Sequence, residues 1–174
     1  MSQIKSKERV RDLAEVYTNE REVNAMLDLI SLKNPYDIIS YRYLEPACGN
    51  GNFLVEILAR KLAMVNEKYA DKNLSIYEFY IVRSLSTIYG IDICPDNVAE
   101  ARQRLLAQIK SNFDLHKGSY ACSDGFIEAL EYVLEKNIVV GDSRAISILR
   151  KALSSDESKQ NGTLFKKVSG IKPF

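Results

Sequence analysis

The residues best suited to chemistry lie in the run from Tyr43 to Leu54, which reads YLEPACGNGNFL. This pattern is typical of the end of a buried strand, a glycine turn and the start of a helix. Glycines let the backbone bend tightly and approach a ligand closely, and the N–H groups at a helix start point towards such a ligand. Because the carboxylate of Glu45 precedes the turn, a ligand with a cationic amine suits the loop better than one with a pyrophosphate.

Two further acids follow apolar segments in the same way. Asp92 ends the segment from Tyr89, and Asp142 follows the segment from Ile138 to Gly141. Ligands of open α/β sheets bind beyond the carboxyl ends of the strands, so we expect the acids of the three strand ends to face one ligand. They could accept hydrogen bonds from an amine, a ribose diol and an adenine amino group, and Ile93 would offer an apolar face to the adenine ring. S-adenosylmethionine (SAM) carries all of these groups.

Each element has a simpler interpretation on its own. A strand-end acid is more often a helix cap or a solvated turn, and Gly-x-Gly turns occur in other nucleotide-binding folds. The three acids in order, each after an apolar strand, favour the ligand interpretation. The separation of Gly49 from Asp92 is about twice the roughly 20 residues of a simple dinucleotide unit. It therefore argues against a nicotinamide or flavin site and predicts an extra helix between the first two strands.

The spacing of apolar residues predicts the elements that must position these acids. Strands are expected at 41–44, 87–91 and 138–140, and helices over 54–69, over 76–85, from Pro95 to Ile109, and from a cap at Asp124 to Leu134. Strands that alternate with helices indicate an α/β fold with a parallel sheet and crossover helices.

The N-terminal part is expected to be helical, with Val23, Met26, Leu27 and Ile30 on one buried face and a turn at Asn34–Asp37. Three strands are fewer than a doubly wound sheet normally has, so the C-terminal half of the sheet is expected to be missing. The expected organisation is an N-terminal helical segment (1–36), an incomplete Rossmann-like domain (37–150) and a flexible C-terminal tail (151–174).

Composition sets broad limits on function. The chain has 174 residues, of which 46% are hydrophobic and 27% charged, and its formal charge is +1. Such values are typical of a soluble globular domain. A net charge near zero gives no strong electrostatic field that would attract nucleic acid. Apolar runs are far shorter than the roughly 20 residues of a membrane span. The three cysteines are widely spaced and have no metal-ligand spacing, so no metal site is expected. An odd, widely spaced set of cysteines is typical of a reducing compartment, and we therefore expect a cytoplasmic protein.

The motifs resemble those of adenine-N6 DNA methyltransferases from bacterial restriction–modification systems. The run Glu45–Leu54 resembles the first SAM motif of that family, Tyr89–Val98 the second and Asn137–Asp142 the third. The segment Glu15–Thr18 resembles the motif that folds over the methionine end of SAM, although the family often has proline where this chain has Asn19. The resemblance covers roughly residues 10–145 and implies a class I methyltransferase domain, of Rossmann-like fold.

The resemblance also implies roles for individual residues. Glu45 would bind the methionine ammonium, Asp92 the ribose hydroxyls and Asp142 the adenine amino group, while Ile93 would flank the adenine ring. The residues expected to contact SAM are Tyr17, Thr18, Glu45, Pro46, Ala47, Gly49, Gly51, Phe53, Asp92, Ile93, Asp142 and Ser143.

We expect the chain to bind SAM but not to catalyse methyl transfer. Methyl transfer to a flipped adenine in this family needs a motif of Asn or Asp, two prolines and an aromatic residue, and the chain has none; its end, Gly170 to Phe174, is at most a degenerate copy. We expect no catalytic residue and no methyl transfer by the chain alone, and DNA binding only in a complete enzyme. Alternatives are a SAM-binding module of a split or truncated enzyme with a complementary methyltransferase or restriction subunit, a small-molecule methyltransferase, and a decayed gene product.

Other chemistry-bearing residues have plainer interpretations. Cys48 is expected to be a small buried filler rather than a nucleophile, and His116 a surface residue. Asn34–Tyr36 superficially resembles the catalytic motif, but it precedes the glycine loop and is expected to be a turn. An open sheet edge after the third strand would invite association into a homo-oligomer.

Overall fold

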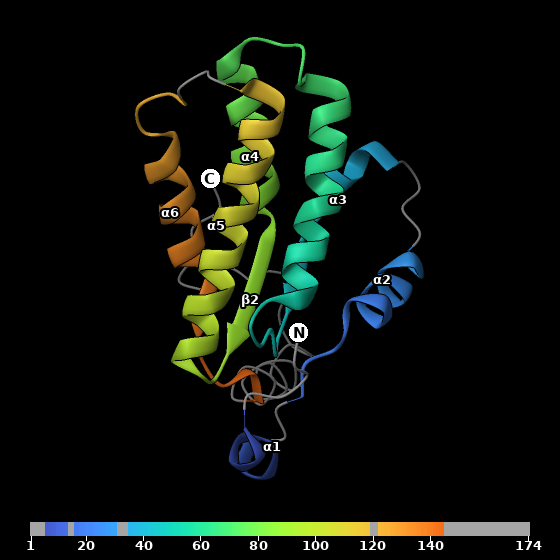
Figure 1. Ribbon diagram of the computed structural model, residues 1–174, viewed down its shortest axis with the longest axis vertical. Coiled ribbons are helices and arrows are strands. Elements are labelled where there is room, and N and C mark those ends of the chain that lie inside the picture. Colours follow the sequence, from blue (N-terminus) through green and yellow to red (C-terminus); the bar gives the residue numbers. More distant parts are fainter. Residues whose placement is uncertain (1–5, 14–15, 31–34, 119–121, 145–174) are drawn as a thin grey trace, which may run out of the picture. The chain divides into compact units, whose positions relative to one another are not determined.

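The computed structural model describes residues 6–13, 16–30, 35–118 and 122–144 (Figure 1). Contacts within the chain divide it into two units, residues 1–141 and residues 142–174. All helices and strands below belong to the first unit. The tail predicted at 151–174 lies outside the described residues.

A three-stranded parallel sheet forms the centre of the first unit. Its strands are β1 (Tyr43–Glu45), β2 (Ile88–Asp92) and β3 (Ile138–Val140), in the spatial order β1-β2-β3. Glu45 is in register with Gly90, and Asp92 with Val140. The α/β class and the parallel sheet predicted from the sequence are therefore confirmed.

The first strand begins two residues later than predicted. The backbone N–H of Tyr41 donates to the carbonyl of Asp37 at 2.8 Å, so this residue still belongs to the preceding turn. Tyr43 is the first to pair with the neighbouring segment, through its N–H and the carbonyl of Thr87 at 2.9 Å. The spacing of apolar residues could not show whether the Tyr41 N–H pairs with Asp37 or with the neighbouring strand.

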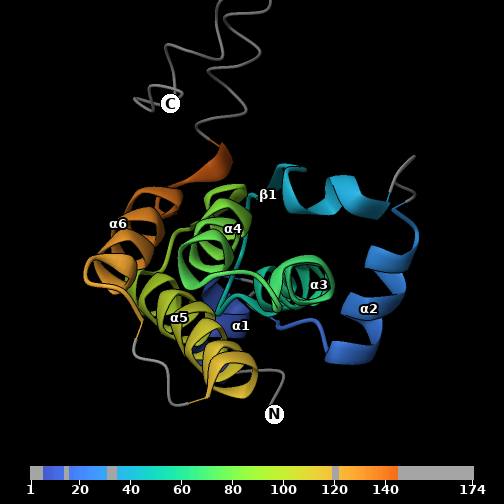
Figure 2. The same ribbon diagram turned by 90° about the horizontal axis from the view of Figure 1, so that it is seen from above.

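Two helices connect each pair of strands. They are α3 (Asn52–Tyr69) and α4 (Leu74–Ser86) between β1 and β2, and α5 (Pro95–Lys117) and α6 (Phe126–Asn137) between β2 and β3. All four contact β2, while α3 packs on α4 and α5, and α4 packs on α6 (Figures 1 and 2). The extra helix predicted between the first two strands is α4.

The core lies between these helices and one face of the sheet. Its residues recur at helical spacing in each helix, as the sequence pattern predicts. The fully buried members are Leu54, Leu58, Val65, Tyr77, Ile81, Ala101, Leu105, Ile109, Leu130, and the strand residues Ile88 and Ile138.

Before β1, the chain forms the helices α1 (Lys7–Leu13) and α2 (Glu20–Asp28) and the 3₁₀-helix η1 (Pro35–Ile39). Val23 and Leu27 of α2 are buried, but Met26 is 54% exposed and Ile30 43% exposed. The buried face of this helix is therefore narrower than the four residues predicted for it. The contacts of α2 are mainly with α3, and one helix covers only a narrow stripe. Ile30 lies beyond the end of α2 at Asp28.

Two local predictions, a turn and a helix cap, also differ from the structure. Where a turn was expected at Asn34–Asp37, the chain forms the 3₁₀-helix η1 from Pro35. Asn34 lies outside the described residues. The N-cap of α6 is Gly125 rather than Asp124, because Gly125 adopts a left-handed conformation with φ of 86° while Phe126 N–H donates to the carbonyl of Ser123.

A buried lysine holds the approach to β1. Lys61 of α3 is 0% exposed. Its Nζ donates to the carbonyl oxygens of Ile38 (2.6 Å), Ile39 (3.2 Å) and Tyr41 (2.7 Å) and to the hydroxyl of Thr87 (2.7 Å). Burial lowers the pKa of Lys61 to about 7. This one side chain thus ties η1 and the starts of β1 and β2 to α3.

Candidate functional site

The glycine loop between β1 and α3 is shaped first by packing. Gly51 has φ of 88°, and a Cβ there would lie 2.9 Å from the Cβ of Ala101 in α5. Gly90, in the neighbouring strand, faces Leu54, whose Cδ1 would lie 2.7 Å from an added Cβ. Both glycines therefore allow α3 to begin close against α5 and β2, which is a structural role independent of any ligand.

The backbone N–H groups of the loop are largely used within the protein. They donate as follows: Ala47 to Glu45 Oε1 (3.3 Å), Cys48 to the Ile91 carbonyl (2.9 Å), Gly49 to Asp92 Oδ2 (2.8 Å) and Gly51 to the Cys48 carbonyl (2.8 Å). Loops that hold pyrophosphate present such N–H groups to the phosphate oxygens. This loop lacks that arrangement at these four positions.

Asp92 organises the loop from the end of β2. Its Oδ1 accepts from the Cys94 N–H at 2.9 Å and from Asn97 Nδ2 at 3.2 Å, while its Oδ2 accepts from the Gly49 N–H at 2.8 Å. A carboxylate oxygen can accept about two hydrogen bonds. Oδ2 therefore has room for one further donor.

The charges of Glu45 and Asp92 both affect the same residue of the loop, Cys48. Both carboxylates contribute, after burial, to raising the pKa of the Cys48 thiol to about 12. Burial also raises the pKa of Glu45 itself, and the bond from the Ala47 N–H partly offsets this. Two carboxylates beside the loop make it negative, which favours a cationic group over an anionic one.

The N-terminal segment with Tyr17 and Thr18 reaches this loop. The Tyr17 ring lies 3.2 Å from the position that a Cβ on Gly49 would occupy, and its hydroxyl donates to Asn97 Oδ1 at 2.9 Å. The carbonyl of Thr18 accepts from Asn52 Nδ2 at 2.8 Å. The structure therefore brings Tyr17 and Thr18 together with the glycine loop.

Sequence reasoning missed a polar network that braces the loop from α5. Arg104 Nη1 donates to the Asn50 carbonyl and to Asn52 Oδ1, both at 2.7 Å, and Asn50 Nδ2 donates to Glu100 Oε1 at 2.9 Å. Asn97, Glu100 and Arg104 recur at intervals of three and four residues, which places them on one face of α5. That spacing was the available signal.

One buried acceptor in the loop is unsatisfied. The side-chain oxygen of Asn50 is buried and receives no hydrogen bond from the described residues. A buried polar atom without a partner costs free energy.

The other predicted site residues have varied positions. Pro46 and Ala47 are exposed, Phe53 packs partly against the core, and Ile93 beside Asp92 is 49% exposed. Asp142 and Ser143 belong to the second unit, where Asp142 accepts hydrogen bonds from the backbone and guanidinium of Arg144.

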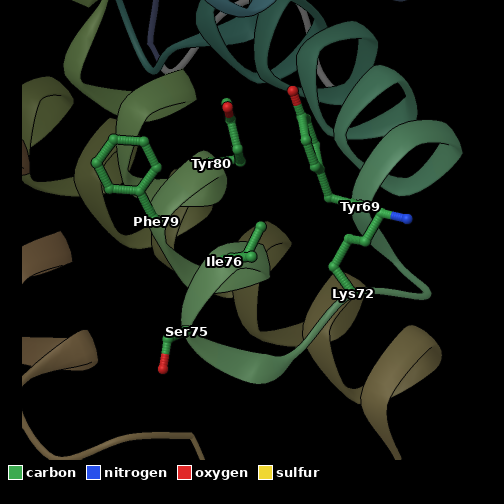
Figure 3. Close-up of a pocket in the computed structure, with 6 residues that line it drawn as sticks. All are labelled: Tyr69, Lys72, Ser75, Ile76, Phe79 and Tyr80. Atoms are coloured by element: carbon green, nitrogen blue, oxygen red, sulfur yellow. The ribbon is translucent and has the colours of Figure 1, made fainter.

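The hollow shown in Figure 3 lies away from the loop. It has a volume of about 470 Å³ and is lined by Tyr69, Lys72, Ser75, Ile76, Phe79 and Tyr80. The rings of Tyr69 and Tyr80 stack at 3.6 Å. Among the described residues, no carboxylate lines this hollow, and Lys72 is its one charged residue, whereas the loop lies beside two carboxylates.

Comparisons with protein-family models, with curated proteins and with solved structures found no match.

In the described part of the chain, no group of three or more His, Cys, Asp or Glu side chains is placed to hold a metal ion. No helix among the described residues has the length and apolar character to cross a membrane. His116 is exposed, as the sequence predicts.

The cysteines should differ in reactivity. Cys48 is buried with a pKa raised to about 12, whereas Cys94 and Cys122 are partly exposed. Because the thiolate is the nucleophile, iodoacetamide at pH 8 is expected to label Cys94 and Cys122 before Cys48 in the folded chain. Peptide mass mapping over time measures the order, and urea-unfolded chain is the control in which all three react alike. Early labelling of Cys48 would contradict the buried-filler assignment.

Proposed function

We propose that this chain is the cofactor-binding part of a SAM-dependent adenine-N6 DNA methyltransferase. The observation that carries the proposal is the pair of carboxylates, Glu45 and Asp92, at the ends of adjacent parallel strands beside a loop whose N–H groups are largely used internally. Such a loop favours a cationic ammonium and sulfonium over a pyrophosphate. The choice of DNA adenine as acceptor rests on the sequence resemblance.

The residues present fit SAM in charge and hydrogen bonding. Glu45 would hold the ammonium, and the remaining acceptor site on Asp92 Oδ2 would receive a ribose hydroxyl. Exposed Ile93 offers an apolar surface for adenine. A role for Asp142 in accepting from the adenine amino group rests on the sequence resemblance alone. When bound, the cofactor supplies a methyl group on a sulfonium sulfur.

Binding without methyl transfer is the expected behaviour of the chain by itself. The 174 residues contain no motif of Asn or Asp followed by two prolines and an aromatic residue. In the proposed reaction, that motif would accept hydrogen bonds from the target amino group and stack on the flipped base.

A second candidate, a SAM-binding module that works with a complementary polypeptide, is favoured by the sheet. Within the described residues, β1 pairs with β2 on one side only, and Leu44 of β1 is 60% exposed. Parallel sheets are normally covered on both faces. Restored methyl transfer on adding a chain that supplies the missing motif would favour this candidate, and its failure with a folded partner would count against it.

Glu45→Gln is expected to weaken SAM binding at least about tenfold, because it removes a charge-assisted hydrogen bond to the ammonium. Isothermal titration at pH 7.5 measures the dissociation constant. Glu131→Gln, at an exposed position of α6, is the matched control and should bind as the unaltered chain does. Since burial raises the pKa of Glu45, affinity should also fall on acidification before an ordinary carboxylate would titrate.

Two results would overturn the proposal. One is tighter binding of NAD than of SAM, since the dinucleotide carries a pyrophosphate. The other is equal SAM affinity for Glu45→Gln and Glu131→Gln. Methyl transfer to unmodified DNA by the purified chain would instead contradict the expected inactivity.

A further inference from the structure

Asn97 connects two parts of the candidate site that lie far apart in the sequence. It occupies the first turn of α5 and is 1% exposed. Its Oδ1 accepts from the Tyr17 hydroxyl at 2.9 Å, and its Nδ2 donates to Asp92 Oδ1 at 3.2 Å. The amide thus lies between the N-terminal segment and the strand-end carboxylate.

Only one orientation of this amide satisfies both neighbours. A carboxylate can only accept, so the amino group of Asn97 must face Asp92, and its oxygen then faces Tyr17. The Tyr17 hydroxyl can donate to that oxygen. Tyr17 therefore supports the orientation in which Asn97 donates to the carboxylate.

The result is an Asp92 carboxylate held from three directions. Oδ1 receives two donors, from Cys94 and Asn97, and Oδ2 receives the Gly49 N–H. These bonds restrict rotation of the carboxylate and leave the open acceptor position on Oδ2. A fixed acceptor distinguishes a ligand that has a hydroxyl there from one that lacks it, because the mismatched ligand leaves the acceptor unpaired.

We propose that Asn97, supported by Tyr17, is a positioning residue that makes Asp92 selective for a ligand with ribose hydroxyls. That the ligand is SAM is taken from the proposed function, on which this part of the inference rests. The positioning itself is a property of the ligand-free chain. The two parts can therefore be tested separately.

The positioning is tested by amide hydrogen exchange of the ligand-free chain. Asn97→Ala should make the Gly49 N–H exchange about tenfold faster, because a carboxylate that rotates protects this N–H less well. Tyr17→Phe, which keeps the ring, should shift the rate in the same direction by less. The Gly51 N–H, which donates to the Cys48 carbonyl, is the internal reference and should keep its rate.

The selectivity is tested by comparing SAM with its 2′-deoxy and 3′-deoxy analogues. We expect removal of the hydroxyl that Asp92 binds to weaken binding to the unaltered chain about tenfold or more. In Asn97→Ala this ratio should fall towards one, and in Tyr17→Phe it should fall part of the way. Simple destabilisation would lower affinity for all three ligands and leave the ratio unchanged.

Tyr77→Phe is the matched control. The Tyr77 hydroxyl donates to Asn66 Oδ1 at 2.6 Å and accepts from Asn112 Nδ2 at 3.0 Å. The substitution therefore removes a buried tyrosine–asparagine bond of the same kind, and a second one, elsewhere in the unit. Its ligand ratio and Gly49 exchange should match those of the unaltered chain. An unchanged ratio and exchange rate in Asn97→Ala would overturn the inference while the proposed function stands. Absence of SAM binding to the unaltered chain would overturn the proposed function and the selectivity, and the exchange rates would still decide the positioning.

Discussion

Lys61→Met is expected to lower the free energy of unfolding by about 3 kcal/mol or more at pH 7. Methionine keeps the length of the side chain but removes every donor from a site lined by oxygens. The carbonyls of Ile38 and Tyr41 each lose a hydrogen bond of 2.6–2.7 Å. The Thr87 hydroxyl loses a donor at 2.7 Å but still donates to the Ser84 carbonyl. Each buried group left unpaired costs about 1–3 kcal/mol. Urea unfolding followed by circular dichroism measures the change.

The same substitution should remove a pH dependence. Burial lowers the pKa of Lys61 from 10.5 to about 7 in the folded chain. Between these two values the unfolded chain binds a proton that the folded chain does not, so folding stability rises with pH. The contribution is fully present above the unfolded pKa and is lost as the pH falls through about 7. Lys61→Met should lack this rise between pH 7 and 9.

Lys110→Met is the matched control for both measurements. Lys110 is an exposed residue of α5, so its removal should change stability little and leave the slope against pH as in the unaltered chain. If Lys61→Met and Lys110→Met unfolded at the same urea concentration, the tie between η1, the two strand starts and α3 would have no energetic importance.

Gly51→Ala is expected to destabilise the chain by about 2–4 kcal/mol, for two separable reasons. The φ of 88° is unfavourable for any residue with a Cβ, and the new methyl group would lie 2.9 Å from the Cβ of Ala101. Gly125→Ala isolates the first reason. Gly125 is also a helix N-cap, with φ of 86°, and an added Cβ would meet nothing within 4 Å.

The second reason is tested by giving the methyl group room. Ala101→Gly removes the side chain that Gly51→Ala would meet, so the double variant should be more stable than the sum of the two single changes predicts. Thermal unfolding of the four chains gives the coupling free energy. A Gly51→Ala variant no less stable than Gly125→Ala, with additive effects in the cycle, would show that α3 can shift away from α5 at little cost.

The elements of this fold could be predicted from local pattern because burial imposes it. Apolar residues at spacings of three and four locate α3, α4, α5 and α6, and short apolar runs ending in Glu45 and Asp92 locate the strands. Boundaries were less predictable. Whether Tyr41 pairs with the sheet or with Asp37 depends on which carbonyl is nearer, and no sequence pattern carries that information.

The candidate site was predictable in the same uneven way. Glu45 and Asp92 follow directly from their strands, and parallel pairing brings the two strand ends together. Asn97 lies in the run that resembles the second SAM motif, but neither it nor Arg104 could be given a role, because a polar residue on a helix is ordinarily solvated. Their importance comes from what α5 packs against, which is the loop between β1 and α3.

The sequence by itself determined the α/β class, the order of the elements and the acid that precedes the glycine loop, since each depends on residues close together in the chain. Only the tertiary structure decided how those groups are used. It directs the N–H of Gly49 to Asp92, links Tyr17 to Asn97 and buries Lys61 among carbonyls. These contacts join residues distant in sequence, and they form because packing the helices on one sheet leaves each buried polar group few partners to bind.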